Sequence, residues 1–67
     1  MVLNIWVNSK ELNVSENCTV SSLLKELGLS SRAAIWINGR QVFMRDYETM
    51  TLKEKDEIKI IRPLGGG

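Results

Sequence analysis

One short stretch with helical periodicity, set between strand-like segments, most limits what this chain can fold into. Four apolar residues recur at i, i+3, i+4 and i+7, as on one face of an amphipathic helix: Val20, Leu23, Leu24 and Leu27. Thr19 is a favourable N-cap because its hydroxyl accepts a hydrogen bond from the first turn, and Gly28 suits the left-handed position that ends a helix. A helix this short depends on tertiary packing, so the neighbouring segments must cover its apolar face.

Five segments with the composition of β-strands surround the predicted helix. They are residues 2–7, 11–14, 33–37, 40–43 and 57–62. Side chains alternate between the two faces of a strand, which places Leu3, Ile5 and Val7 together, and likewise Leu12 with Val14 and Ile58 with Ile60. Asn8-Ser9-Lys10 and Asn38-Gly39 predict turns. Pro63 is expected to end the last strand because it has no N–H to donate.

The resulting order, β-β-α-β-β-β, predicts an α+β domain in which one helix packs on one face of a mixed sheet. Met50 and Leu52 are expected to anchor the loop at residues 44–56 to the core. Residues 1–62 are predicted to form one domain, and residues 63–67 a flexible C-terminal glycine tail.

The size and composition of the chain exclude several functional classes. A domain of 67 residues buries only about 60% of the surface that its unfolded chain exposes, which leaves one thin core and no deep cleft for catalysis. The net charge is +1 with acidic and basic residues interspersed, so neither nucleic acid nor an anionic membrane is an expected partner. No histidine and one cysteine give no expected metal site and no internal disulfide. With no signal-peptide pattern in the first residues, these features predict a cytoplasmic protein.

The face of the sheet opposite the helix is expected to carry aromatic side chains. Trp6, Trp36 and Ile61 should lie on it, with Asn4 and Lys59 nearby. Aromatic residues on an uncovered face are typical of protein interfaces, although two tryptophans can also simply brace a thin sheet across its strands. We expect partners to contact Trp6, Trp36, Ile61 and, beyond the last strand, Leu64.

The remaining reactive or charged residues indicate no catalytic site. Cys18 precedes a helix N-terminus, which lowers a thiol pKa, but the chain offers no histidine to act as its base. Arg45 and Arg62 are interpreted as steering residues for the tail or as solvated surface charges. Four acidic residues are interpreted as solvated loop charges: Asp46, Glu48, Asp56 and Glu57.

Taken together, these features resemble a known family along the whole chain. They comprise the element order, Thr19-Val20-x-x-Leu23-Leu24, Asn38-Gly39, the approach from Leu52 to Ile60 and the terminal Gly66-Gly67. In this combination the chain resembles the sulfur-carrier proteins of thiamine biosynthesis, the ThiS type, within the ThiS/MoaD family of β-grasp, ubiquitin-like folds. It departs from the family pattern at Val42-Phe43-Met44 and at Tyr47. It also departs at Lys55, a position at which members often have glycine.

The resemblance implies that the working group is the C-terminal carboxylate of Gly67. In the family a ubiquitin-activating-type adenylyltransferase uses ATP to adenylate this carboxylate. A persulfide from a sulfur donor such as cysteine desulfurase then converts it to a thiocarboxylate, which donates sulfur to an acceptor enzyme such as thiazole synthase. The chain is then a protein co-substrate and no enzyme, with no permanently bound cofactor. Gly65 and Gly66 would let the tail enter a narrow slot, because glycine has no Cβ.

Three alternatives remain open from the sequence. Sulfur carriers of the molybdopterin-synthase type share the same fold and tail, as do carriers of other sulfur-transfer pathways. A ubiquitin-like protein modifier would use the same tail to form isopeptide bonds. A β-grasp interaction module would not use its tail at all.

Overall fold

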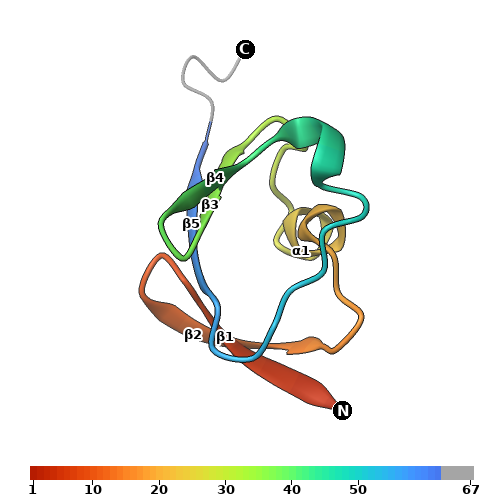
Figure 1. Ribbon diagram of the computed structural model, residues 1–67, viewed down its shortest axis with the longest axis vertical. Helices are drawn as coiled ribbons and strands as arrows, with labels where there is room; N and C mark the ends of the chain where they lie inside the picture. The colour runs from red at the N-terminus through yellow and green to blue at the C-terminus, as the bar shows by residue number, and fades with distance from the viewer. Residues whose placement is uncertain (63–67) are drawn as a thin grey trace.

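The structure is a computed structural model that describes residues 1–62. The tail predicted at residues 63–67, with the strand-ending Pro63, lies outside the described residues. The elements follow in the order β1 (Val2–Val7), β2 (Lys10–Ser15), α1 (Val20–Glu26), β3 (Ala34–Ile37), β4 (Arg40–Val42), the 3-10 helix η1 (Met44–Asp46) and β5 (Glu57–Ile61) (Figure 1). The predicted order is confirmed, with the short η1 inserted before the last strand.

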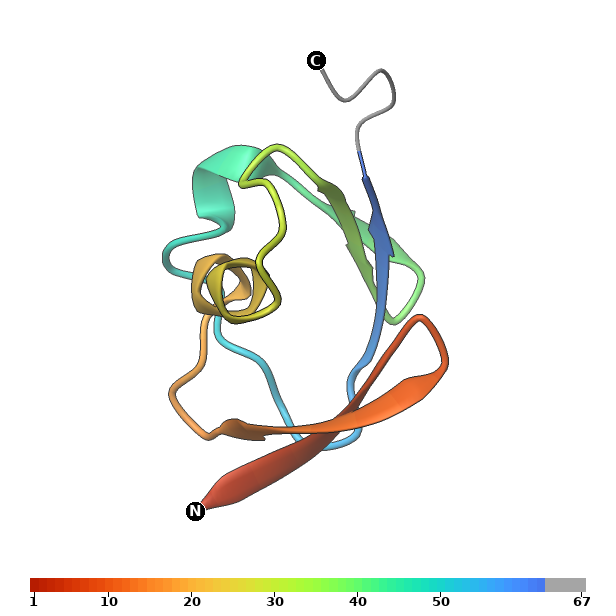
Figure 2. The same cartoon turned by 180° about the vertical axis from the view of Figure 1, so that it is seen from behind.

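The five strands form one mixed sheet in the order β2-β1-β5-β3-β4. β5 lies in the middle, parallel to β1 and antiparallel to β3, while β1–β2 and β3–β4 are antiparallel hairpins. The sheet curves around α1, which covers its concave face (Figures 1 and 2). This arrangement is the predicted α+β, β-grasp architecture, and among residues 1–62 no helix covers the convex face of the sheet.

The core lies between α1 and the concave face. The alternation predicted for β1 and β5 is confirmed, since Ile5, Ile58 and Ile60 are buried. Val20, Leu23 and Leu24 of α1 are buried against them, but Leu27 is 38% exposed, so its predicted place on the buried face is wrong. The physical reason is that α1 ends at Glu26 and Leu27 is the C-cap, beyond the last turn that packs on the sheet. Gly28 follows in the left-handed conformation, with φ of 70°.

Two-residue turns join the hairpins. Asn8 and Ser9 have φ of 50° and 71°, and Asn38 and Gly39 have φ of 52° and 83°. Positive φ at both central residues is the type I′ geometry, whose twist matches that of the flanking strands. The first turn is therefore shorter than the predicted Asn8-Ser9-Lys10, and Lys10 already belongs to β2.

The segment between β4 and β5 caps the start of α1. Thr19 accepts a hydrogen bond from the Ser22 backbone N–H at 3.1 Å, as predicted for an N-cap. The next two N–H groups of the helix, those of Val20 and Ser21, donate to the backbone oxygens of Met50 and Tyr47. These contacts satisfy helix donors that have no intrahelical partner.

The same segment contributes different side chains to the core from those predicted. Leu52 is buried, as expected of an anchor, but Met50 is 38% exposed, so its predicted anchoring role is wrong. Met50 contributes its backbone carbonyl to the helix instead. Tyr47 is buried in its place and donates a hydrogen bond from its hydroxyl to the Ala33 carbonyl at 2.8 Å.

Candidate functional site

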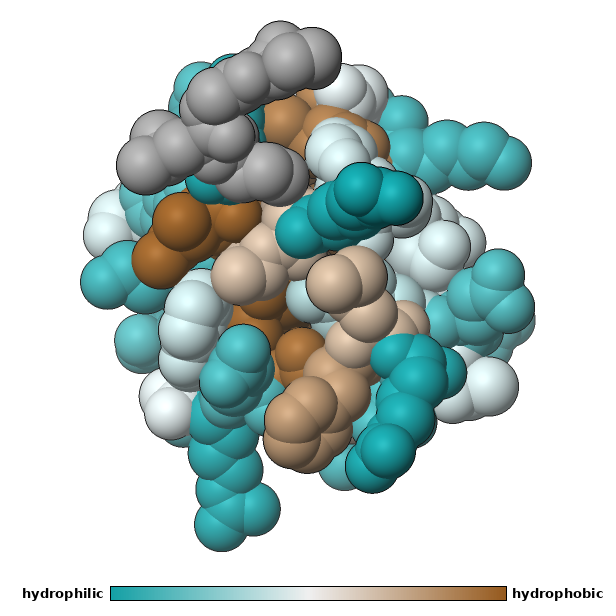
Figure 3. Space-filling model, turned by 90° about the horizontal axis from the view of Figure 1, so that it is seen from above, coloured by the Kyte–Doolittle hydropathy of each residue, from teal (hydrophilic) through white to brown (hydrophobic). Residues whose placement is uncertain are grey.

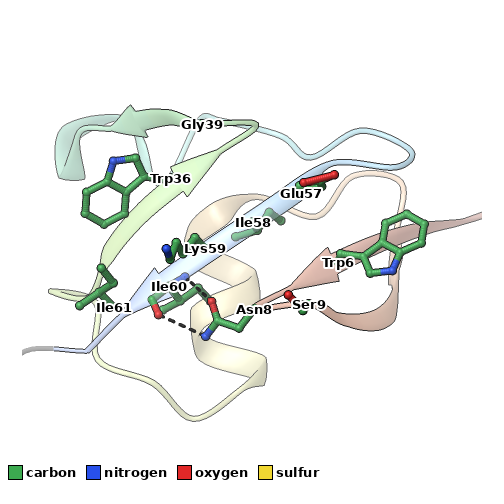
Figure 4. A pocket seen from close by; sticks show the side chains of 10 residues that line it. All are labelled: Trp6, Asn8, Ser9, Trp36, Gly39, Glu57, Ile58, Lys59, Ile60 and Ile61. Atoms are coloured by element: carbon green, nitrogen blue, oxygen red, sulfur yellow. Dashed lines mark hydrogen bonds between the residues drawn. The ribbon is translucent and has the colours of Figure 1, made fainter.

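The convex face brings together the residues predicted to contact partners within the described chain. Trp6 lies on β1 and Trp36 on β3, on either side of the central β5. Both tryptophans are half-buried, and Ile61 is 48% exposed. Figure 4 shows Trp36 close to Ile61, while Trp6 lies at the other end of the same shallow depression. Leu64, predicted to extend this surface, lies outside the described residues.

Charged side chains divide this face into two halves. Trp6 is in register with Glu11 on β2 and with Glu57 on β5, so its surroundings are acidic. Trp36 is in register with Lys59 (Figure 4), and the exposed Arg62 follows Ile61, the last residue of β5. The half nearest to the end of the described chain therefore combines apolar and basic groups.

Figure 3 shows the end of the molecule at which β5 terminates. Hydrophobic side chains lie at the left and in the middle of this view, while a hydrophilic one lies across the centre and others project from the rim. Arg45, for which the sequence predicts a steering role or a solvated surface charge, is exposed on η1, with its guanidinium carbon 5.3 Å from the ring centroid of Phe43.

Asn8 connects the β1–β2 turn to the last strand. Its Nδ2 donates to the Ile60 carbonyl at 3.2 Å, and its Oδ1 accepts from the Ile60 N–H at 2.9 Å (Figure 4). One side chain thus satisfies both backbone groups of a residue near the end of β5. Sequence analysis identified Asn8 only as a turn residue, because no local pattern reports a contact across 52 positions.

The fold agrees with the family that nearly the whole sequence matches. A match to the ThiS family extends over residues 3–67, nearly the whole sequence. The chain belongs to the ThiS family. It is therefore a ThiS-type sulfur carrier with the β-grasp fold, as the sequence resemblance implied.

Two solved structures support the membership in the ThiS family. A crystal structure of the thiamine biosynthesis protein ThiS from Geobacter metallireducens superimposes with a TM-score of 0.80 at 26% identity. That alignment covers 97% of this chain and 100% of the other. A solution NMR structure of a thiamine biosynthesis protein from the same organism gives a TM-score of 0.78 at 26% identity, over 97% and 88% of the two chains.

A curated relative is much longer than this ThiS-family chain. It is described as a thiazole synthase from Paramagnetospirillum magneticum and is 33% identical over 66 residues. The match includes 97% of this chain but only 20% of the relative, so the chain spans about a fifth of that protein's length.

A second asparagine of the ThiS-type fold secures the beginning of β5. Asn38 accepts a hydrogen bond from the Glu57 N–H at 3.0 Å, and its Nδ2 donates to Asp56 Oδ1 at 3.0 Å. Asp56 also accepts from the Lys53 N–H at 2.8 Å and is only 8% exposed. Its interpretation as a solvated loop charge is therefore wrong, since its carboxylate organises the turn before β5. Glu48 and Glu57 are exposed, as interpreted, and Asp46 is half-buried.

Cys18 lacks the features of a reactive thiol. Its side chain is buried, and its Sγ lies 3.4 Å from the Thr19 carbonyl oxygen, to which it donates. Burial, together with the negative charge of Glu26, raises the pKa of the Cys18 thiol above its ordinary value of 9.0. This direction is opposite to the lowering that a helix N-terminus produces, so the thiol stays protonated at neutral pH.

Two further features are absent from residues 1–62. This part of the chain contains no cluster of three or more residues of the types that bind metal ions. It also contains no helix with the length and hydropathy needed to cross a membrane. The predicted reactive residue Gly67 and the predicted tail residues Gly65 and Gly66 lie outside the described residues.

Proposed function

We propose that this chain carries sulfur for thiazole formation in thiamine biosynthesis, as a thiocarboxylate on Gly67. The observation that carries the proposal is the ThiS-family match, which continues through the three glycines to residue 67. The similarity to a protein described as a thiazole synthase supports thiazole synthase as the sulfur acceptor. The carrier itself performs no catalysis in this scheme, because the activating and accepting steps belong to its partners.

The chemistry of a terminal carboxylate explains why an activating enzyme is needed. Such a group has a pKa of about 3.3–3.7, so it is ionised at neutral pH and is a poor electrophile. Attack of the Gly67 carboxylate on the α-phosphate of ATP releases pyrophosphate and forms an acyl-adenylate. A cysteine persulfide, supplied by a desulfurase, then displaces AMP, and a thiol cleaves the S–S bond to leave the thiocarboxylate.

The composition of residues 63–67 suits this reaction. Three consecutive glycines have no Cβ, so they fit a narrow channel and adopt backbone angles that other residues avoid. Five residues span roughly 17 Å when extended, at about 3.3–3.6 Å each. The body of the carrier can therefore remain outside an active site that its carboxylate enters.

The convex face is the proposed docking surface for the adenylyltransferase and for thiazole synthase. Trp6, Trp36 and Ile61 expose apolar surface there, and Leu64 would continue it toward the tail. Tryptophan is enriched among residues that dominate binding energies at interfaces. The basic half around Lys59 and Arg62 would face acidic groups of a partner that receives the tail.

The proposal is tested by intact-mass spectrometry after incubation with the activating enzyme, ATP and a sulfur donor. The unmodified carrier should gain the mass of an oxygen-to-sulfur exchange. Deletion of Gly67, or addition of one residue after it, should abolish this gain while circular dichroism shows an unchanged fold. Normal exchange in the extended variant would contradict a role for the Gly67 carboxylate.

A further inference from the structure

We propose that Asn8 is a positioning residue for sulfur loading, because its side chain fixes the point at which the tail leaves the sheet. The inference rests on the proposed function, since it concerns how residues 63–67 are presented to the activating enzyme. Asn8 does not touch the reacting carboxylate in this account. It acts through Ile60 and the end of β5.

The side chain of Asn8 extends the row of hydrogen bonds between β1 and β5 beyond the end of β1. The Trp6 N–H donates to the Asp56 carbonyl, and the Asn8 N–H donates to the Ile58 carbonyl, both at 2.9 Å. The next residue of β5 on that edge is Ile60, but β1 has ended at Val7 and the chain turns away. The Asn8 amide occupies the position of a missing strand residue, donating to and accepting from Ile60.

The last residues of β5 have few other attachments in the described chain. β3 holds the opposite edge, where Ala34 at the beginning of that strand is in register with Ile61. Ile60 itself is buried, but Ile61 is 48% exposed and Arg62 is exposed, so burial contributes little to holding the residues after Ile60. The two hydrogen bonds of Asn8 are therefore a principal restraint on the side of β5 that faces β1.

This restraint affects how much chain must be ordered when the tail binds. With Ile60 held in the sheet, only the residues after the strand lose conformational freedom in the partner's channel. Without the hydrogen bonds of Asn8, the end of β5 detaches from the sheet more often. Each detached residue must then be ordered again on binding, at a cost in conformational entropy. The expected effect is an increase of about tenfold in KM for the carrier, which corresponds to ordering about one residue. The kcat should change little, because the bound complex is the same.

The chain supplies matched variants for this comparison. Asn8→Gly removes the amide but keeps a residue that adopts positive φ readily, so the turn itself is preserved. Asn38→Gly removes the equivalent amide from the other hairpin turn, where it binds Glu57 and Asp56 at the beginning of β5. Asn8→Asp keeps the acceptor for the Ile60 N–H and loses the donor to the Ile60 carbonyl.

The experiment measures KM and kcat for thiocarboxylate formation with all four proteins, at a temperature at which circular dichroism shows each to be folded. Hydrogen exchange at the Ile60 amide is followed in parallel. Asn8→Gly should raise KM about tenfold and speed Ile60 exchange, Asn8→Asp should fall between it and the wild type, and Asn38→Gly should retain the wild-type KM.

Three results would overturn the inference, and they differ from failure of the proposed function. An unchanged KM for Asn8→Gly, or an equal increase for Asn38→Gly, would show that Asn8 contributes to stability alone. Unchanged Ile60 exchange in Asn8→Gly would show that the amide does not hold the strand. A wild-type protein that never acquires sulfur would overturn the proposed function, and the positioning role with it.

Discussion

The Nδ2 of Asn38 donates to Oδ1 of Asp56 at 3.0 Å and thereby joins the β3–β4 turn to the residue before β5. The other oxygen of Asp56 accepts from the Lys53 N–H, so the carboxylate connects two loops. Asn38 in turn accepts from the Glu57 N–H. This network fixes the point at which the central strand enters the sheet.

Replacement of Asp56 should therefore destabilise the fold. Asp56→Ala removes the two hydrogen bonds that a buried carboxylate accepts from Asn38 Nδ2 and the Lys53 N–H, which costs about 1–3 kcal/mol. Urea unfolding followed by tryptophan fluorescence measures this loss. Glu48→Ala is the control, since Glu48 is exposed, and its free energy of unfolding should stay within about 0.5 kcal/mol of the wild type.

Tyr47 should make stability depend on pH in the alkaline range. Burial raises the pKa of its phenol above 10.0, so the folded state favours the protonated form. The stabilisation is fully present below the unfolded pKa and is lost as pH rises through the folded pKa. Urea unfolding between about pH 8 and about pH 11, from two units below the ordinary tyrosine pKa of about 10 to one unit above it, should show a steeper decline for the wild type than for Tyr47→Phe.

The same variant should also be less stable at neutral pH. Tyr47→Phe removes the donor to the Ala33 carbonyl, a buried acceptor, at a cost of about 1–2 kcal/mol. Equal alkaline slopes for the two proteins would contradict the assignment of this pH dependence to Tyr47.

Local sequence patterns predicted the elements of this fold better than its loops. Period-two alternation located Trp6, Trp36 and Ile61 on the face away from α1, because a strand's side chains alternate whatever its neighbours are. The burial of Asp56 and Tyr47 depends instead on where the segment between β4 and β5 crosses α1. That path is set by contacts distant in sequence, such as Tyr47 with Ala33, which no local pattern reports.

The candidate site, too, could be predicted from the sequence only in part. The strand pattern indicated the aromatic face, and the terminal glycines indicated the reactive end. The double hydrogen bond between Asn8 and Ile60 could not be predicted, because it requires the parallel pairing of β1 with β5 to end at Val7 and Ile58, two residues before Ile60. The tight turn alone explains why position 8 is an asparagine, so the sequence does not indicate that Asn8 also binds Ile60.

Docking to the activating enzyme should depend on the tryptophan nearest to the tail. Trp36→Ala removes an anchor beside Ile61 and should weaken binding by about 2 kcal/mol or more, roughly thirtyfold. Phe43→Ala is a matched control, because Phe43 is 59% exposed and lies outside the lining of the convex face. Isothermal titration calorimetry with the adenylyltransferase gives both affinities. An equal loss of affinity in the two variants would contradict docking through the convex face.

Cys18 should be dispensable for sulfur loading. Its raised pKa and its burial predict slow alkylation by iodoacetamide at pH 7 in the folded protein and fast alkylation in urea. Cys18→Ser should load sulfur with the wild-type kcat, although the more polar hydroxyl lowers stability in this buried position. A variant that folds but acquires no sulfur would assign the carrier chemistry to the thiol.

The most direct measurement places the transferred sulfur on a residue. The carrier is incubated with its activating enzyme, ATP, a desulfurase and cysteine containing a heavy sulfur isotope. The undigested protein is then fragmented in a mass spectrometer. The account predicts the heavy sulfur in the fragments that contain Gly67, in place of one carboxylate oxygen, and its loss when thiazole synthase and its other substrates are added. Heavy sulfur on Cys18, or none on the C-terminal fragments, would contradict the central claim.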